Sequence, residues 1–130
     1  MATLTIRDET TTGAISEPFT LDFLTEHITV RELIRERVYQ EVGDHNANQA
    51  DTFRGLVQPT DAERTLNGFK VPRGRMIDWE PQYRKACEAF EQNGILVLVG
   101  DRQTRSLDEI ITITPSTEVS FLKLVPLVGG

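Results

Sequence analysis

The sequence predicts an α+β fold in which two strands, a helix, a third strand, a short turn and a final strand follow one another. Three observations carry this prediction: two opening runs that alternate polar and apolar residues, a helix start signal at residues 29–32, and an apolar run at residues 95–99. With 130 residues, of which 38% are hydrophobic, the chain is long enough for one core and too short for two substantial ones. We therefore expect a single domain over residues 1–130.

The opening residues are predicted to form a β-hairpin. Residues 3–7 alternate polar and apolar with Leu4 and Ile6 on one side, which is the period of a half-buried strand. Residues 8–13 have the composition of a turn. A second alternating run, 19–23, then predicts the returning strand of the hairpin.

A helix is predicted to begin after the hairpin. Thr29 and Glu32 have the spacing of a capping box, and Ile28 and Leu33 stand at the positions of a hydrophobic staple around it. The apolar residues that follow keep helical spacing and predict one buried stripe: Val30, Leu33, Ile34, Val38 and Val42. Gly43 is expected to end this helix.

Residues 44–75 are predicted to form a long connection, because Asp, Asn, Gln, Thr, Gly and Pro dominate the segment. His45 lies there among amide and acidic side chains, and a single imidazole in such surroundings indicates a polar loop and not a metal site. Residues 78–92 return to helical spacing, with Asn93 and Gly94 as the stop signal. Cys87 falls on the apolar stripe of this helix, which favours a buried thiol over a reactive nucleophile.

The last part of the chain predicts two further strands. Residues 95–99 are apolar at every position, which is typical of a central strand covered on both faces. A tight turn is expected at Gly100, and the capping-box spacing of Ser106 and Glu109 predicts a single helical turn. Residues 118–125 are expected to form the final strand. Pro126 lacks an N–H donor, so that pairing should end there and leave residues 127–130 extended and free.

Composition excludes several classes of function. A net charge of -6 with only three lysines argues against nucleic acid, and a single cysteine excludes an internal disulfide and a Cys-based zinc site. The N-terminus has no apolar signal core and no run is long enough to span a membrane, so we expect a cytoplasmic protein without membrane contact. With two histidines, no Ser-His-Asp arrangement and no metal spacing, the chain is not expected to be an enzyme. We expect no catalytic, cofactor-binding or metal-binding residues.

A family resemblance follows from the order of elements. Residues 96–101, 106–109 and 116–121, ending in Gly129 and Gly130, resemble the last half of ubiquitin, and residues 1–43 resemble its first hairpin and helix. The chain is thus similar to ubiquitin-like proteins, whose β-grasp fold packs a mixed sheet on one helix. The implied core is 1–43 and 94–130, with an inserted loop-helix segment, 44–93, between the first helix and the third strand. The sharpest motif of the resemblance is the terminal Gly-Gly.

The resemblance implies a protein modifier, conjugated through an isopeptide bond, of the kind encoded in bacterial ubiquitin-like operons. A partner activating enzyme would use ATP to adenylate the carboxylate of Gly130, and a partner cysteine would capture the acyl group as a thioester before transfer to an amine. Gly129 would keep the tail slim, while Leu127 and Val128 would be gripped by the activating enzyme. The other implied partners are a conjugating enzyme, an isopeptidase and target proteins. Because the chain ends bare, no processing protease is expected.

The same alignment implies a candidate partner patch on the outer face of the sheet, formed by Val97, Leu122 and Leu124. Lys123 would point toward the core. Two alternatives stay open for the patch: an exposed docking surface, or a surface covered by the helix that begins near Trp79. Ubiquitin has arginines before its glycines where this tail has residues 126–128, Pro-Leu-Val, so a cognate activating enzyme should read an apolar tail.

Two other functions remain open at this point. Small β-grasp sulfur carriers also end in Gly-Gly, and they hold sulfur as a terminal thiocarboxylate. A non-covalent interaction domain would use neither glycine.

Overall fold

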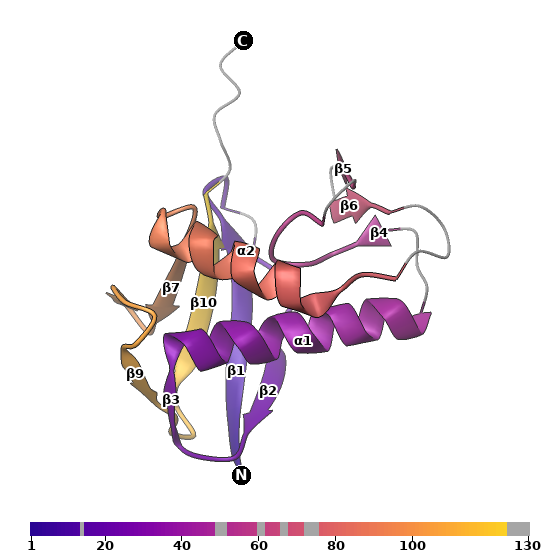
Figure 1. Ribbon diagram of the computed structural model, residues 1–130. Coiled ribbons are helices and arrows are strands. Elements are labelled where there is room, and N and C mark those ends of the chain that lie inside the picture. Colours follow the sequence, from indigo (N-terminus) through magenta and orange to yellow (C-terminus); the bar gives the residue numbers. More distant parts are fainter. Residues whose placement is uncertain (14, 49–51, 60–61, 66–67, 72–75, 125–130) are drawn as a thin grey trace. The chain divides into compact units, whose positions relative to one another are not determined.

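A computed structural model of the chain describes residues 1–13, 15–48, 52–59, 62–65, 68–71 and 76–124. The chain divides into two compact units, Met1–Leu33 with Glu88–Gly130, and Ile34–Cys87. Helices α1 (Val30–Asn48) and α2 (Trp79–Glu91) each contain residues that are assigned to both units; both are labelled in Figure 1. The described residues therefore form a mixed α+β fold with two helices.

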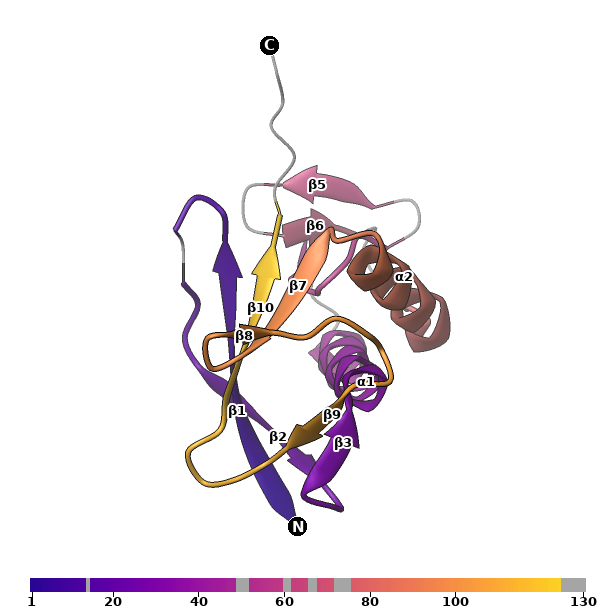
Figure 2. The same cartoon turned by 90° about the vertical axis from the view of Figure 1, so that its left-hand side faces the viewer.

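The first unit is built on a five-stranded mixed sheet (Figure 2). Strands β1 and β10 are parallel neighbours, and the other neighbouring strands are antiparallel. Across the sheet the order is β2 (Phe19–Phe23), β1 (Ala2–Thr10), β10 (Glu118–Lys123), β7 (Ile95–Val99) and β8 (Arg102–Gln103). The last strand of the chain thus lies at the centre of the sheet.

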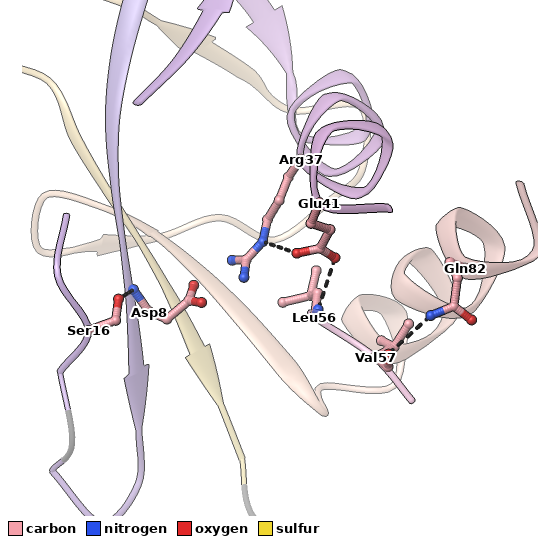
Figure 3. Close-up of polar contacts among 7 residues, drawn as sticks. All are labelled: Asp8, Ser16, Arg37, Glu41, Leu56, Val57 and Gln82. Carbon is pink, nitrogen blue, oxygen red and sulfur yellow. Dashed lines mark hydrogen bonds and ion pairs between the residues drawn. The ribbon is translucent and has the colours of Figure 1, made fainter. Parts of the chain in front are cut away.

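The predicted hairpin is confirmed, but its turn is shorter than expected. β1 continues to Thr10, because Asp8, Glu9 and Thr10 pair with residues 121–123 of β10. The reversal follows at residues 11–13, where Gly13 has a φ of 90° and donates its N–H to the Thr10 carbonyl at 3.0 Å. Asp8 N–H also donates to Ser16 Oγ at 2.9 Å (Figure 3). Long-range pairing with β10 therefore overrides a locally turn-like sequence.

Alternation along the strands gives the sheet one buried face. Leu4, Ile6 and Phe121 are completely buried, and Val119 is almost so. Leu4 and Ile6 lie on the side of β1 that the sequence predicted to be buried. The other buried apolar side chains of this unit come from its two segments, 1–33 and 88–130. They are Ala2, Leu21, Phe23, Ile28, Val30, Leu33, Phe90, Ile95, Val97, Leu107, Ile111 and Ile113.

The start of α1 agrees with its sequence signal. Thr29 Oγ1 accepts the N–H of Glu32 at 3.1 Å, as expected for an N-cap. The first two N–H groups of the helix, at Val30 and Arg31, donate to the carbonyls of Glu109 and Leu107 at 3.0 and 2.9 Å. A short strand pair, β3 (His27–Thr29) with β9 (Ile110–Thr112), leads into this junction and was not predicted. The polypeptide after β8 therefore helps to cap the helix.

The predicted end of α1 at Gly43 was wrong, since the helix continues to Asn48. Within the second unit, the Asn46 side chain donates to the carbonyl of Ile77 at 2.8 Å and accepts its N–H at 2.9 Å. His45 is buried there as well. A glycine inside a helix costs about 1 kcal/mol relative to alanine, and these later contacts outweigh that cost. The predicted apolar stripe of the helix is confirmed, with Val42 the most exposed member at 2%.

The segment predicted as a long, partly ordered connection contains short strands. It forms a three-stranded antiparallel sheet in the order β4 (Thr52–Phe53), β6 (Gly68–Lys70) and β5 (Glu63–Thr65). Glu41 accepts the N–H of Leu56 at 2.9 Å and an N–H of Arg37 at 3.4 Å, and Gln82 donates to the carbonyl of Val57 at 3.1 Å (Figure 3). Buried and half-buried polar side chains thus provide contacts that hydrophobic periodicity does not reveal.

The second helix and its end are confirmed. Asn93 has a positive φ of 61° and donates its N–H to the carbonyl of Phe90 at 3.1 Å, while Gly94 donates to the carbonyl of Ala89 at 2.8 Å. This pair of bonds is a Schellman motif, in which a left-handed residue closes the helix. Residues 95–99 then form β7, but β10 and not β7 is the central strand. The residues from Ser106 to Glu109 form a turn and not the predicted helical turn.

Candidate functional site

The predicted tail residues lie outside the described part of the chain. This applies to Leu127, Val128, Gly129 and Gly130, and also to Pro126. The structure describes the polypeptide as far as Leu124, whose N–H donates to the Gly94 carbonyl at 3.1 Å and continues the pairing of β10 with β7 by one position. The assignments made for residues 126–130 therefore stay predictions.

The partner patch predicted on the outer face of the sheet needs one correction. Val97 is completely buried and lies directly opposite Phe121 in the β10–β7 register, so that its side chain faces the core. Leu96 takes its place, because Leu96 lies opposite Leu122. Side chains on a strand alternate between faces, so an error of one residue in the alignment moves a side chain to the other face.

The corrected surface is an apolar stripe on two strands. Leu122 and Leu124 have the outward parity that was predicted for them; Leu122 is half-buried and Leu124 is 38% exposed. Leu96 and Leu98 of β7 are half-buried on the same face. We call Leu96, Leu98, Leu122 and Leu124 the outer patch. Partial exposure of four leucines leaves apolar area for contact with a partner.

Polar side chains border the outer patch on both sides. On β1, Arg7 lies opposite Ser120 and Glu9 lies opposite Leu122, and on β8 Gln103 lies opposite Leu98. An apolar centre with a polar border is a common composition for a contact surface between proteins. Lys123 has the opposite parity and is half-buried, in agreement with its predicted direction.

A small electrostatic cluster organises the polypeptide between β8 and β9. The carboxylate of Glu109 accepts from the Arg102 guanidinium and, at 3.1 Å, from the N–H of Arg105. The hydrogen bond from Arg102, followed by that from the Arg105 backbone, holds the pKa of Glu109 below its usual value. Arg31, in the first turn of α1, also pairs with Asp108 at 3.3 Å. This cluster fixes a loop at the helix start, and the lowered pKa of Glu109 is the effect expected of a carboxylate held by two donors.

The side chains of His45 and Cys87 are both buried. The ring of His45 lies edge-on to that of Phe53, with centroids 5.3 Å apart, and burial lowers the pKa of His45 despite an opposing hydrogen bond with the Thr52 backbone. The reading of His45 as a loop residue was wrong, since it lies in α1. Cys87 is buried, as predicted. Among the described residues, no group of three His, Cys, Asp or Glu side chains is placed to bind a metal ion.

Comparison with models of protein families, with curated proteins and with solved structures found no match to this chain. Within the described residues, no helix combines the length and apolar character needed to cross a membrane. The fold and the outer patch are therefore the observations on which a function can be argued.

Proposed function

We propose that the chain is a ubiquitin-like protein modifier with a β-grasp fold, cytoplasmic, that is conjugated to target amines through the carboxylate of Gly130. The observation that carries this proposal is the sheet. Its first hairpin, β1 and β2, joins the last strand through a parallel β1–β10 pair, and β10 lies between β1 and β7. This five-stranded mixed arrangement is compatible with a β-grasp fold, and fold alone does not establish function.

The proposed chemistry belongs to partner enzymes. An activating enzyme joins the Gly130 carboxylate to the α-phosphate of ATP and releases pyrophosphate. A partner's cysteine thiolate then attacks the acyl carbon and releases AMP, and a target amine displaces the thiolate to form the amide bond. This chain contributes the acyl group and no general base. The proposal requires that the C-terminal carboxylate of the active protein is that of Gly130.

The glycines and the residues before them have separate roles in this proposal. Gly129 and Gly130 have no Cβ, so the acyl carbon stays open to attack and the tail fits a narrow channel. Leu127 and Val128 give the activating enzyme apolar side chains to bind. The outer patch, with Leu96 in place of Val97, supplies a separate docking surface for the conjugating enzyme or isopeptidase. Binding and chemistry are thus divided between the sheet and the tail.

The test is a covalent shift that depends on Gly130. The full chain with an N-terminal tag is produced in its native host beside two variants, one lacking Gly130 and one carrying Gly43→Ala as a matched control. Gly43 is helical, and a Cβ built there meets nothing within 4 Å, so this substitution should leave the fold intact. We expect higher-mass species that resist thiol reductant for the wild type and for Gly43→Ala, and none without Gly130.

Other outcomes of the same experiment would contradict the proposal. A chain that shows no adducts but a terminal oxygen replaced by sulfur would identify a sulfur carrier. Adducts that persist without Gly130 would show attachment through another residue. If no sample contained an adduct, and if a strain that produces only the chain without Gly130 grew like the wild-type strain, the protein would be a non-covalent interaction domain.

A further inference from the structure

Strand β2 forms one edge of the five-stranded sheet. Among the described strands it pairs only with β1, and its register against β1 is continuous over all five of its residues, 19–23. The strand at the opposite edge, β8, has only two residues. Residues 19–23 contain neither proline nor lysine, the residues that most often protect an edge strand from pairing. The edge of β2 is therefore a template for another extended chain.

The hydrogen bonds of Asp8 show which backbone groups of β2 face this edge. The Asp8 N–H donates to Ser16 Oγ at 2.9 Å, and its carbonyl accepts the N–H of Ser16 at 2.8 Å, so Asp8 directs its backbone groups toward the β2 side of β1. Residues of a strand alternate in this direction, so the even-numbered positions of β1 form hydrogen-bonded pairs with the odd-numbered positions of β2. The N–H and C=O groups of Thr20 and Asp22 therefore face away from β1.

Thr20 and Asp22 are both exposed. Among the described residues, no backbone group pairs with the N–H or C=O of either residue. Their side chains lie on the exposed face of the sheet, where Asp22 accepts a hydrogen bond from Thr3 Oγ1 at 2.7 Å. Leu21, between them, is 6% exposed and has the opposite parity. The edge thus offers the backbone groups of two residues, both in the first unit.

We propose that this edge binds a second copy of the same chain, so that two β2 strands pair antiparallel about a twofold axis at Leu21. Thr20 of each copy then lies opposite Asp22 of the other. Because both residues direct their backbone groups outward, these are hydrogen-bonded pairs, in which the two residues exchange both of their N–H···O=C bonds. On the exposed face, the Thr20 hydroxyl donates to the Asp22 carboxylate of the second copy.

The residues along the edge favour a second copy in this one register. Only outward-facing positions form hydrogen-bonded pairs, so the next possible registers differ by two residues. One of them places Asp22 opposite Asp22 of the second copy, where like charges repel. The other places Asp22 opposite Pro18, which has no N–H to donate. In the proposed register Pro18 lies instead opposite Leu24 of the second copy, an apolar residue that is 90% exposed.

This inference does not rest on the proposed function, since it needs no chemistry at Gly130. It also differs from docking at the outer patch, because the outer patch lies on β7 and β10 and not on β2. A dimer that formed through the outer patch would leave the backbone amides of Thr20 and Asp22 as they are in the monomer. Measurements at these two amides therefore separate the two surfaces.

Small-angle X-ray scattering and amide hydrogen exchange of the full chain test the pairing. We expect the average mass to approach twice that of the monomer at about 1 mM and to equal that of the monomer at about 10 µM, because the dimer population rises with concentration. Between these concentrations, hydrogen exchange at Thr20 and Asp22 should slow at least about threefold. Exchange at Leu21 should slow less, because its N–H already faces β1 in the monomer.

Two substitutions of Thr20 test the register. Thr20→Asp places like charges opposite each other and should weaken dimerisation at least about fivefold, whereas Thr20→Lys places opposite charges there and should strengthen it at least about twofold. Thr11→Asp and Thr11→Lys, in the exposed turn after β1, make the same changes of net charge and should have much smaller effects. Circular dichroism checks that each variant is folded.

Three results would overturn the proposal. The first is a chain that stays monomeric at about 1 mM. The second is a dimer that forms without slower hydrogen exchange at Thr20 and Asp22, since it would use another surface. The third is a pair of folded Thr20 variants that both weaken dimerisation, or that change it no more than the Thr11 variants do.

Discussion

Replacing Val97 by alanine tests the register of β7 against β10, on which the assignment of the outer patch depends. Val97 is 0% exposed and lies opposite Phe121, which is also completely buried. The substitution removes two buried carbon groups at about 0.8 kcal/mol each, and the cavity left beside Phe121 adds about 1 kcal/mol, which gives a total of about 2–3 kcal/mol. The matched substitution Leu96→Ala removes three carbon groups from a half-buried site, and about 1 kcal/mol is expected there.

The assay is urea unfolding of both variants followed by far-UV circular dichroism, since Trp79 reports on the second unit and not on this sheet. A free energy of unfolding lowered by at least about twice as much for Val97→Ala as for Leu96→Ala is the expected result. Equal losses, or a larger loss for Leu96→Ala, would refute the register. The outer patch would then include Val97, as the sequence alignment first implied.

Three further predictions follow from particular residues. Gly43→Ala should raise the free energy of unfolding by about 0.5–1 kcal/mol, because Gly43 is helical and a Cβ there meets nothing within 4 Å; a loss would show that the helix ends before Asn48. Thr29→Ala should cost about 1 kcal/mol by removing the N-cap bond to Glu32, whereas Thr29→Ser should cost much less; equal costs would exclude the cap. Acid should destabilise the fold in two steps, measured by urea unfolding from pH 8 to pH 3. The folded pKa of His45 lies below the ordinary value of 6.5, so below pH 6.5 the unfolded chain binds the proton first and stability falls until the folded pKa is reached. The folded pKa of Glu109 lies below 4.5, so its contribution is present above pH 4.5 and is lost as the pH falls through that folded pKa. His45→Gln should remove the first step only, and a first step of unchanged size in this variant would contradict the assignment.

Much of the fold could be predicted because local signals and burial agree. The alternation in β1 and β2, the Thr29 cap and the Asn93 stop each specify a structure that does not depend on distant residues. Gly43 shows the limit of this reasoning. A glycine ends many helices. Here Asn46 forms two hydrogen bonds with the backbone of Ile77, 31 residues later in the sequence, and these bonds stabilise the helix beyond Gly43. The three-stranded sheet was missed for the same reason, since its strands have two or three residues each and no measurable period.

The candidate site was less predictable than the fold. Residues 95–99 are apolar throughout, so their sequence contains no alternation from which the inward and outward side chains can be told apart. The parity of β10 was readable because Val119 and Phe121 alternate with Ser120. That of β7 is set by the hydrogen bonds of Gly94 and Gly100 to β10, which only the structure shows.

In the proposed function, Gly130 is the acyl donor in a covalent bond to other proteins. Tandem mass spectrometry of tryptic peptides from adducts of the tagged chain, purified under denaturing conditions, tests this directly. Because Lys123 is the last tryptic site, we predict target lysines that carry Leu-Val-Pro-Leu-Val-Gly-Gly joined through the glycine carbonyl. Adducts whose tryptic peptides show a free Gly130 carboxylate, with the linkage elsewhere in the chain, would contradict the claim.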